Sequence, residues 1–224
     1  MLSNPYWNTR PKTKKDLLKM IEAARTIHYS EKLIPLSHLG NSNFYVEARE
    51  EVTDRPIYAN SLLQPIFHQV FQREDHRFPI AIGIPFSGNM LAGCMQGMHG
   101  TANALIGCRL TRSQKKDHGN TDGLLPTPDH DSHWYFTIDN TISSGGSFLK
   151  AMKQMESLGY ETKEMLHCFL FDRGLGGLEH LQRKGYKVFA AYHVPTIIRT
   201  FVELDLWPQE RLALLEQEIE SMKV

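Results

Sequence analysis

Five short apolar runs, most of them separated by amphipathic segments, limit what this chain of 224 residues can fold into. The runs cover residues 78–85, 104–108, 134–138, 165–171 and 188–192. Each has the length of a buried strand, and helical patterns over 148–158, 178–184 and 195–204 lie between or after the later runs. Short apolar strands that alternate with helices are typical of parallel sheets. The sequence therefore predicts an α/β fold with a central, mostly parallel sheet flanked by helices.

The segments on either side of these runs are predicted to be mainly helical. Apolar faces predict helices at 13–28, 61–72 and 208–222, and a short strand is expected at 44–48 after the turn-rich stretch 37–43. The face of the first helix is expected to consist of Leu17, Leu18, Ile21, Ala24 and Ile27. We interpret the chain as one structural unit in three parts, which are residues 1–75, a core at 76–205 and a C-terminal helix at 206–224.

The charge balance and the cysteines limit the classes of partner. The chain has 25 basic and 25 acidic residues, whereas proteins that rely on bulk attraction to phosphate backbones are usually strongly basic. No stretch approaches the roughly 18 apolar residues of a membrane span, and the polar first residues lack the apolar core of a signal peptide. The three cysteines form no CxxC pair, which is typical of reduced thiols. We expect a cytoplasmic protein that binds neither nucleic acid nor membranes.

The most informative motif follows the third apolar run. Residues 138–147 read Ile-Asp-Asn-Thr-Ile-Ser-Ser-Gly-Gly-Ser, and a helix is expected directly after them. Glycines let backbone N–H groups converge on a concave site, hydroxyls add donors, and the start of a helix adds a favourable dipole. This combination favours a phosphate-binding loop; the alternative is an ordinary strand-to-helix turn with a helix cap. Asp139 is a candidate to hold ribose hydroxyls or, through water, a magnesium ion.

Residues 136–147 resemble the phosphoribosyl diphosphate (PRPP) signature of type I phosphoribosyltransferases, in which an apolar strand leads through an acidic pair into a turn of hydroxyls and glycines. The resemblance implies the type I phosphoribosyltransferase fold, with a small N-terminal hood before residue 76. The family's second acid is Asn140 here, which keeps a hydrogen-bonding group but removes a negative charge near the metal and the developing ribosyl cation. The resemblance implies that PRPP is bound by Asp139, Asn140, Thr141, Ile142, Ser143, Ser144, Gly145, Gly146 and Ser147.

Residues 112–119 resemble the mobile catalytic loop of orotate phosphoribosyltransferases in particular, because Arg112, Lys116 and His118 match its Arg-Lys-x-x-Lys-x-His-Gly pattern. The resemblance implies transfer of the phosphoribosyl group from PRPP to orotate, with Mg²⁺. Lys116 and Arg112 would neutralise the diphosphate, and His118 would hydrogen-bond it or pass a proton. The implied catalytic residues are Lys116, His118 and Asp139. In the family this loop closes over a neighbouring subunit's site, which implies a homodimer.

Two further segments imply a site for the acceptor base. Residues 171–177 resemble the family segment whose arginine binds the orotate ring and carboxylate, and residues 39–45 loosely resemble the hood stretch that lays an aromatic ring against the base. They imply that Arg173 pairs with the carboxylate, that Tyr45 stacks on the ring and that Ser143 offers a hydroxyl. The alternatives are that Arg173 is a surface arginine after a strand and that Tyr45 belongs to the core.

Three positions depart from the orotate pattern, because Ser87, Ser113 and His38 stand where the family has lysines. Each lost charge-assisted contact to a diphosphate is worth about 1.5–3 kcal/mol. Two alternatives to an orotate enzyme therefore stay open. One is a PRPP- or nucleotide-binding homologue with weak or no transferase activity, and the other is a phosphoribosyltransferase for another base.

Overall fold

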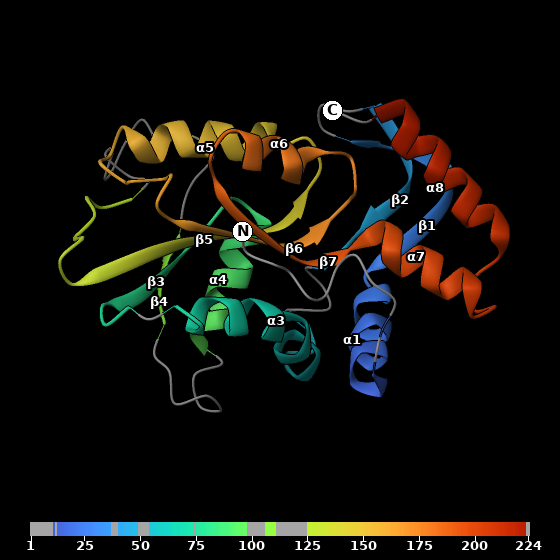
Figure 1. Ribbon diagram of the computed structural model, residues 1–224, viewed down its shortest axis with the longest axis horizontal. Coiled ribbons are helices and arrows are strands. Elements are labelled where there is room, and N and C mark those ends of the chain that lie inside the picture. Colours follow the sequence, from blue (N-terminus) through green and yellow to red (C-terminus); the bar gives the residue numbers. More distant parts are fainter. Residues whose placement is uncertain are drawn as a thin grey trace.

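The computed structural model describes residues 11, 13–36, 40–48, 54–73, 75–97, 106–110 and 125–222. At their centre lies a five-stranded parallel sheet in the order β4-β3-β5-β6-β7 (Figure 1). Its strands are β3 (Phe78–Gly83), β4 (Gly107–Leu110), β5 (His133–Ile142), β6 (Leu166–Asp172) and β7 (Lys187–His193). The predicted parallel sheet is confirmed. The strand order reverses between β3 and β5, which is where open α/β sheets bind ligands.

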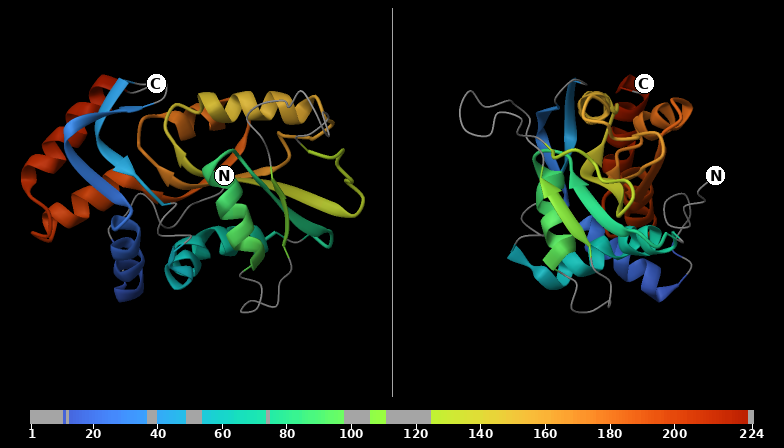
Figure 2. Two further views of the ribbon diagram at one scale, coloured as in Figure 1. Left: turned by 180° about the vertical axis from the view of Figure 1, so that it is seen from behind. Right: turned by 90° about the vertical axis from the view of Figure 1, so that its left-hand side faces the viewer.

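Helices cover both faces of this sheet (Figures 1 and 2). One face carries α5 (Gly146–Glu156) and α6 (Gly177–Arg183), and the other carries α3 (Pro56–Phe71) and α4 (Ser87–Gly97). Helix α7 (Val194–Glu203) follows β7 and packs into the same core as α3 and α4.

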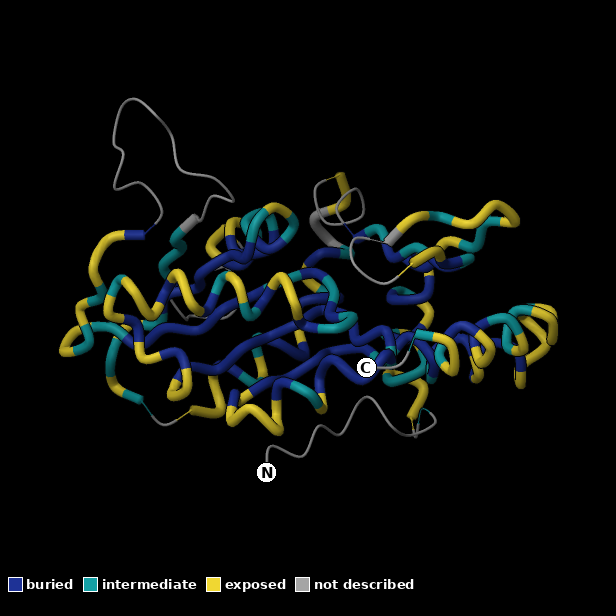
Figure 3. Tube along the Cα trace, turned by 90° about the horizontal axis from the view of Figure 1, so that it is seen from above, coloured by how far each residue is buried: buried dark blue, intermediate teal, exposed yellow. Residues whose placement is uncertain are grey.

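Strands β3, β5, β6 and β7 are buried along most of their length because side chains that alternate along them fill two cores (Figure 3). Phe136 and Ile138 of β5 pack in the core that contains α3 and α4, whereas Tyr135 packs in the core that contains α5.

The segment before the core forms a small antiparallel unit, the hood. It consists of α1 (Lys14–Ala24), β1 (Ile27–Leu36) and β2 (Gly40–Val46), and α8 (Gln209–Met222) packs against β2. No helix in the described part of the chain is long and apolar enough to cross a membrane. The division into residues 1–75, 76–205 and 206–224 stays a prediction.

The structure corrects the first predicted helix. α1 ends at Ala24 rather than at residue 28, because the backbone N–H and the hydroxyl of Thr26 both donate to the Ala23 carbonyl and Ile27 begins β1. Strand β1 itself was not predicted. The expected apolar face is also partly wrong, since Leu18 is 60% exposed and Ile21 38%. The buried residues of α1 are Met20, Ala23 and Ala24.

Three other predicted boundaries also moved. Strand β5 continues to Ile142 instead of ending at residue 138, so the predicted turn begins four residues later. Helix α3 begins at Pro56 rather than at residue 61, since proline is accepted in the first turn of a helix. The strand expected at 104–108 is β4 at Gly107–Leu110. Helix α4 begins at Ser87, two residues after the apolar run 78–85 ends.

Candidate active site

The predicted phosphate loop lies at the carboxyl end of β5, the middle strand of the sheet. β5 ends at Ile142 and α5 begins at Gly146, so the turn between them has three residues. Gly145, the last of these, has a φ of 82°, in the left-handed region that favours glycine. It is the N-cap of α5 and has no side chain that could accept a hydrogen bond from the first amides of the helix. Those amides are therefore available to an anion.

A cavity of about 170 Å³ opens at this turn. Asp139 and Thr141 line it from β5, and Pro85 lines it from the segment between β3 and α4. The complete lining is Pro85, Asp139, Thr141, Ile142, Ser143, Ser144, Gly145, Gly146, Ser147, Phe148 and Phe169. None of these residues carries a positive charge, so within the described part of the chain the attraction for an anion comes from hydroxyls, amides and the helix dipole.

Asp139 and Asn140 occupy the positions of the expected acidic pair. The backbone N–H of Asn140 donates to Asp139 Oδ1 over 2.7 Å. Loss of hydration raises the pKa of the Asp139 carboxyl to about 7, although this hydrogen bond acts in the opposite direction. Asn140 is 9% exposed, and its Oδ1 atom has no hydrogen-bond partner among the residues that the structure describes. Asp139 therefore offers an oxygen to a ligand in the cavity, whereas Asn140 is not among the residues that line it.

Arg173 follows β6 and is only 7% exposed, so the alternative of a surface arginine is wrong. Its Nη2 atom donates to Ser42 Oγ and to the Phe44 carbonyl oxygen, each over 2.8 Å, and lies 3.2 Å from Glu218 Oε1. Glu218 belongs to α8 and is itself 9% exposed. Sequence reasoning missed this carboxylate, because one glutamate among the charges of an amphipathic helix carries no signal of a partner 45 residues away.

Tyr45 and Ser143, the other predicted base-binding residues, lie in different parts of the structure. Tyr45 is in β2, half-buried, and its hydroxyl donates to Glu47 Oε2 over 3.1 Å. Ser143 lies in the turn and lines the cavity, whereas Tyr45 and Arg173 do not line it. The three base-binding assignments stay predictions.

A second carboxylate near the site belongs to the segment 171–177 that resembles the family, but the sequence analysis gave it no role. Asp172 is 1% exposed, and burial raises its pKa to about 7. Its Oδ1 atom accepts from the backbone N–H of Gly174 over 2.9 Å, and its Oδ2 atom lies 3.9 Å from His193 Nε2. Burial lowers the pKa of His193 to about 4, so His193 is neutral at pH 7.

Several predicted residues lie outside the described part of the chain. They are Arg112, Lys116 and His118 of the predicted catalytic loop, and two of the positions where a family lysine is replaced, His38 and Ser113. The third such position, Ser87, is described and begins α4.

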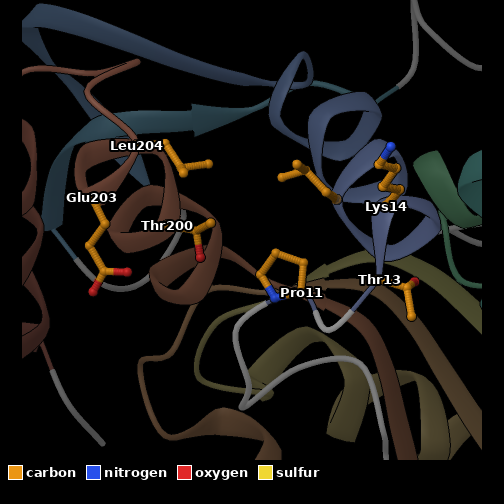
Figure 4. Close-up of a pocket in the computed structure, with 7 residues that line it drawn as sticks. Pro11, Thr13, Lys14, Thr200, Glu203 and Leu204 are labelled. Atoms are coloured by element: carbon orange, nitrogen blue, oxygen red, sulfur yellow. The ribbon is translucent and has the colours of Figure 1, made fainter.

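Two larger hollows lie elsewhere and contain none of the predicted site residues. One is lined by Pro11, Thr13, Lys14, Leu17, Thr200, Glu203 and Leu204, between the start of α1 and the end of α7 (Figure 4). The other is lined by residues of α1 and α3. Among the described residues there is no group of three or more metal-binding side chains.

Comparison with known proteins finds orotate phosphoribosyltransferases and a uridine 5′-monophosphate synthase. The chain is 29% identical to an orotate phosphoribosyltransferase of Sulfolobus acidocaldarius over 142 residues, which cover 61% of this chain and 68% of the relative. It is 23% identical to bovine uridine 5′-monophosphate synthase over 158 residues, which cover 70% of this chain but only 31% of that longer protein. No protein-family model matches the chain.

Solved structures of the same kind share the fold. UMP synthase of Leishmania donovani superposes with a TM-score of 0.68 at 16% identity, covering 94% of this chain and 43% of that protein. Orotate phosphoribosyltransferase of Francisella tularensis superposes with a TM-score of 0.63 at 12% identity, covering 96% of this chain and 98% of that protein. Orotate phosphoribosyltransferase of Mycobacterium tuberculosis in complex with PRPP superposes with a TM-score of 0.52 at 14% identity, covering 68% of this chain and 82% of that protein. The type I phosphoribosyltransferase fold and the resemblance to orotate phosphoribosyltransferases are therefore confirmed.

Proposed function

We propose that this chain transfers the 5-phosphoribosyl group from PRPP to orotate, giving orotidine 5′-monophosphate and pyrophosphate. The observation that carries the proposal is the cavity at residues 141–147, which opens beside Asp139 at the start of α5. The similarity to orotate phosphoribosyltransferases supports the choice of reaction.

The cavity suits the 5-phosphate of a ribose. Its wall contains hydroxyls of Thr141, Ser143, Ser144 and Ser147 and the first residues of an eleven-residue helix. Hydroxyl and amide donors bind a phosphate without a cation, and the helix dipole adds favourable electrostatic energy of about 0.3–1 kcal/mol. The ribose would then extend from the phosphate toward Asp139 and Asn140.

A magnesium ion that arrives with PRPP fits the oxygens at this site. Mg²⁺ is commonly held by one or two carboxylates together with substrate phosphates and water. Asp139 supplies a carboxylate at the cavity, where it would hold the ion through water. When bound, the ion supplies positive charge that neutralises the leaving diphosphate.

The remaining steps are assigned by residue from the resemblance. Lys116 and Arg112 neutralise the departing diphosphate, and His118 donates a hydrogen bond or a proton to it. The anomeric C–O bond breaks through an oxocarbenium-like state, so exclusion of water lets the ring nitrogen attack instead. Tyr45, Ser143 and Arg173 border the base. We further propose that the protein acts in the cytoplasm as a homodimer whose loops close over shared sites.

A second candidate function is favoured by the charges of the site. None of the described lining residues is cationic, and Asn140 replaces an acid of the PRPP signature. The missing cations weaken binding of the diphosphate, and the replaced acid weakens catalysis more than binding. The chain would then be a PRPP- or nucleotide-binding homologue with weak or no transferase activity. A phosphoribosyltransferase for another base is the third candidate.

One assay separates these candidates. Protein, PRPP, Mg²⁺ and orotate are mixed, and the loss of orotate absorbance is followed. Turnover is the result expected for the enzyme. PRPP binding in a calorimeter without turnover would identify the binding homologue, and turnover only with purine bases or nicotinate would identify another acceptor. Absence of both binding and turnover would overturn the proposal.

A further inference from the structure

A buried polar cluster joins the end of β6, the hood and α8. Arg173, Ser42 and Glu218 are all at least nine-tenths buried. Ser42 Oγ donates to Glu218 Oε1 over 2.5 Å and accepts from Arg173 Nη2 over 2.8 Å, so the serine bridges the ion pair. Asn43 donates its backbone N–H to Glu218 Oε2 over 3.2 Å. Both carboxylate oxygens of Glu218 are therefore bound from the hood.

The cluster adjoins the phosphate cavity through the backbone. The N–H of Arg173 donates to the carbonyl oxygen of Ile142 over 3.1 Å, and Ile142 lines the cavity. Gly177, four residues later, packs against the carbonyl of Ser143 in the same cavity wall. The backbone that carries Arg173 therefore lies against the cavity wall, and the proposed function places its guanidinium at the acceptor base.

The charge that Arg173 offers to such a base is already compensated. A guanidinium stays protonated at all pH values of interest, and here a buried carboxylate lies 3.2 Å away. A carboxylate on the acceptor would approach a neutral ion pair and would be repelled by Glu218. A base of the same ring without the carboxylate meets no such repulsion.

We propose that Glu218 is a specificity-determining residue that weakens recognition of an acceptor carboxylate by compensating the charge of Arg173 from within the protein. The proposal rests on the proposed function for the nature of the site. It predicts that the chain discriminates poorly between orotate and uracil, which differ by the carboxylate. It also predicts that loss of the Glu218 charge restores the discrimination.

The test compares wild type with Glu218→Gln, which removes the charge and keeps the size of the side chain. The dissociation constants of orotate and uracil are measured by calorimetry with PRPP present and Mg²⁺ withheld, and kcat/KM for both bases is measured with Mg²⁺. In the variant, the preference for orotate over uracil should rise at least tenfold in both measurements. Glu216→Gln is the matched control, because Glu216 lies on the same helix with its side chain 59% exposed, and its preference should stay within twofold of wild type.

Three results would overturn the inference. They are an unchanged preference in Glu218→Gln, an equal change in affinity for both bases, and failure of orotate to bind this variant. If Glu218→Gln does not fold, Glu218→Asp is measured instead, because it keeps the buried charge but moves the carboxylate away from Arg173 by one methylene. A rise of about threefold in the preference for orotate over uracil then supports the inference, and an unchanged preference overturns it. If the protein turns over but Glu218→Gln leaves the preference for orotate unchanged, only the proposed role of Glu218 is overturned. If the binding preference changes but no variant shows turnover, only the proposed transferase function is overturned.

Discussion

Gly177 lies so close to Ser143 that a Cβ atom at position 177 would be 2.0 Å from the Ser143 carbonyl oxygen. The start of α6 therefore limits where the turn that follows β5 can lie. The obstructing atom belongs to the backbone, so no rotation of a side chain can relieve the overlap.

Gly177→Ala should displace this turn and weaken PRPP binding at least tenfold, because donors that converge on a phosphate lose their bonds when they move apart. Calorimetric titration with PRPP measures the effect, and thermal unfolding reports the accompanying loss of stability. Gly93→Ala is the control, since a Cβ atom there meets nothing within 4 Å and alanine favours helix. Equal PRPP affinities of wild type and Gly177→Ala would show that the contact does not hold the turn.

Asp139→Asn should remove the dependence of PRPP binding on Mg²⁺ and should change the pH dependence of stability. The folded pKa of Asp139, about 7, lies above the ordinary value of 3.8, so the folded state binds more protons between these values. The contribution of Asp139 to stability is then fully present at low pH and is lost as the pH rises toward 7.

The melting temperature of Asp139→Asn should therefore exceed that of wild type by a few degrees at pH 8 and by less at pH 4. Thermal unfolding across this range, with and without Mg²⁺, provides the measurement. A constant difference at all pH values would contradict the raised pKa.

Lys116→Ala should reduce turnover with PRPP and orotate about 10- to 100-fold, the effect of losing one charge-assisted contact to the diphosphate. The melting temperature should stay within about 1 °C of wild type. Lys115→Ala is the control for the neighbouring charge, and it should affect the rate much less. Unchanged steady-state activity in Lys116→Ala would remove this lysine from the mechanism.

His167 should stabilise the folded protein only in its neutral form. It is fully buried, with Nδ1 2.9 Å from Thr137 Oγ1 and Nε2 2.7 Å from the Thr162 carbonyl oxygen. Burial lowers its pKa to about 4, below the ordinary value of 6.5. Its contribution is therefore present above pH 6.5 and is lost as the pH falls toward 4.

His167→Ala should lower the free energy of unfolding at pH 7.5 by roughly 2–4 kcal/mol, since it leaves polar groups and a void in the core. The loss relative to wild type should shrink at pH 5. Denaturant unfolding at both pH values measures this, and an equal loss at both would argue against a neutral buried histidine.

The sequence predicted the parts of this fold whose signals are local. Strand β6 is buried on both faces, so it reads as a continuous apolar run, and the glycines and hydroxyls at 143–147 reveal a turn at the start of a helix. Strand β1 was missed because the alternation of apolar and polar residues stops at Ser30, where Glu31 and Lys32 follow. Strand β1 forms because its backbone pairs with β2, and this pairing cannot be read from the residues of β1 alone.

The sequence by itself determined the parallel sheet and the position of the phosphate turn. Strands buried on both faces appear as continuous apolar runs, and the turn appears as adjacent glycines and hydroxyl residues. Only the tertiary structure decided the electrostatic state of the site. Arg173 appears in the sequence as a free cation, but the fold brings Glu218 within 3.2 Å of it. Asp139 appears as an ordinary acid, but the surrounding protein raises its pKa to about 7. Charge compensation and desolvation depend on which distant residues become neighbours, and no local pattern encodes that.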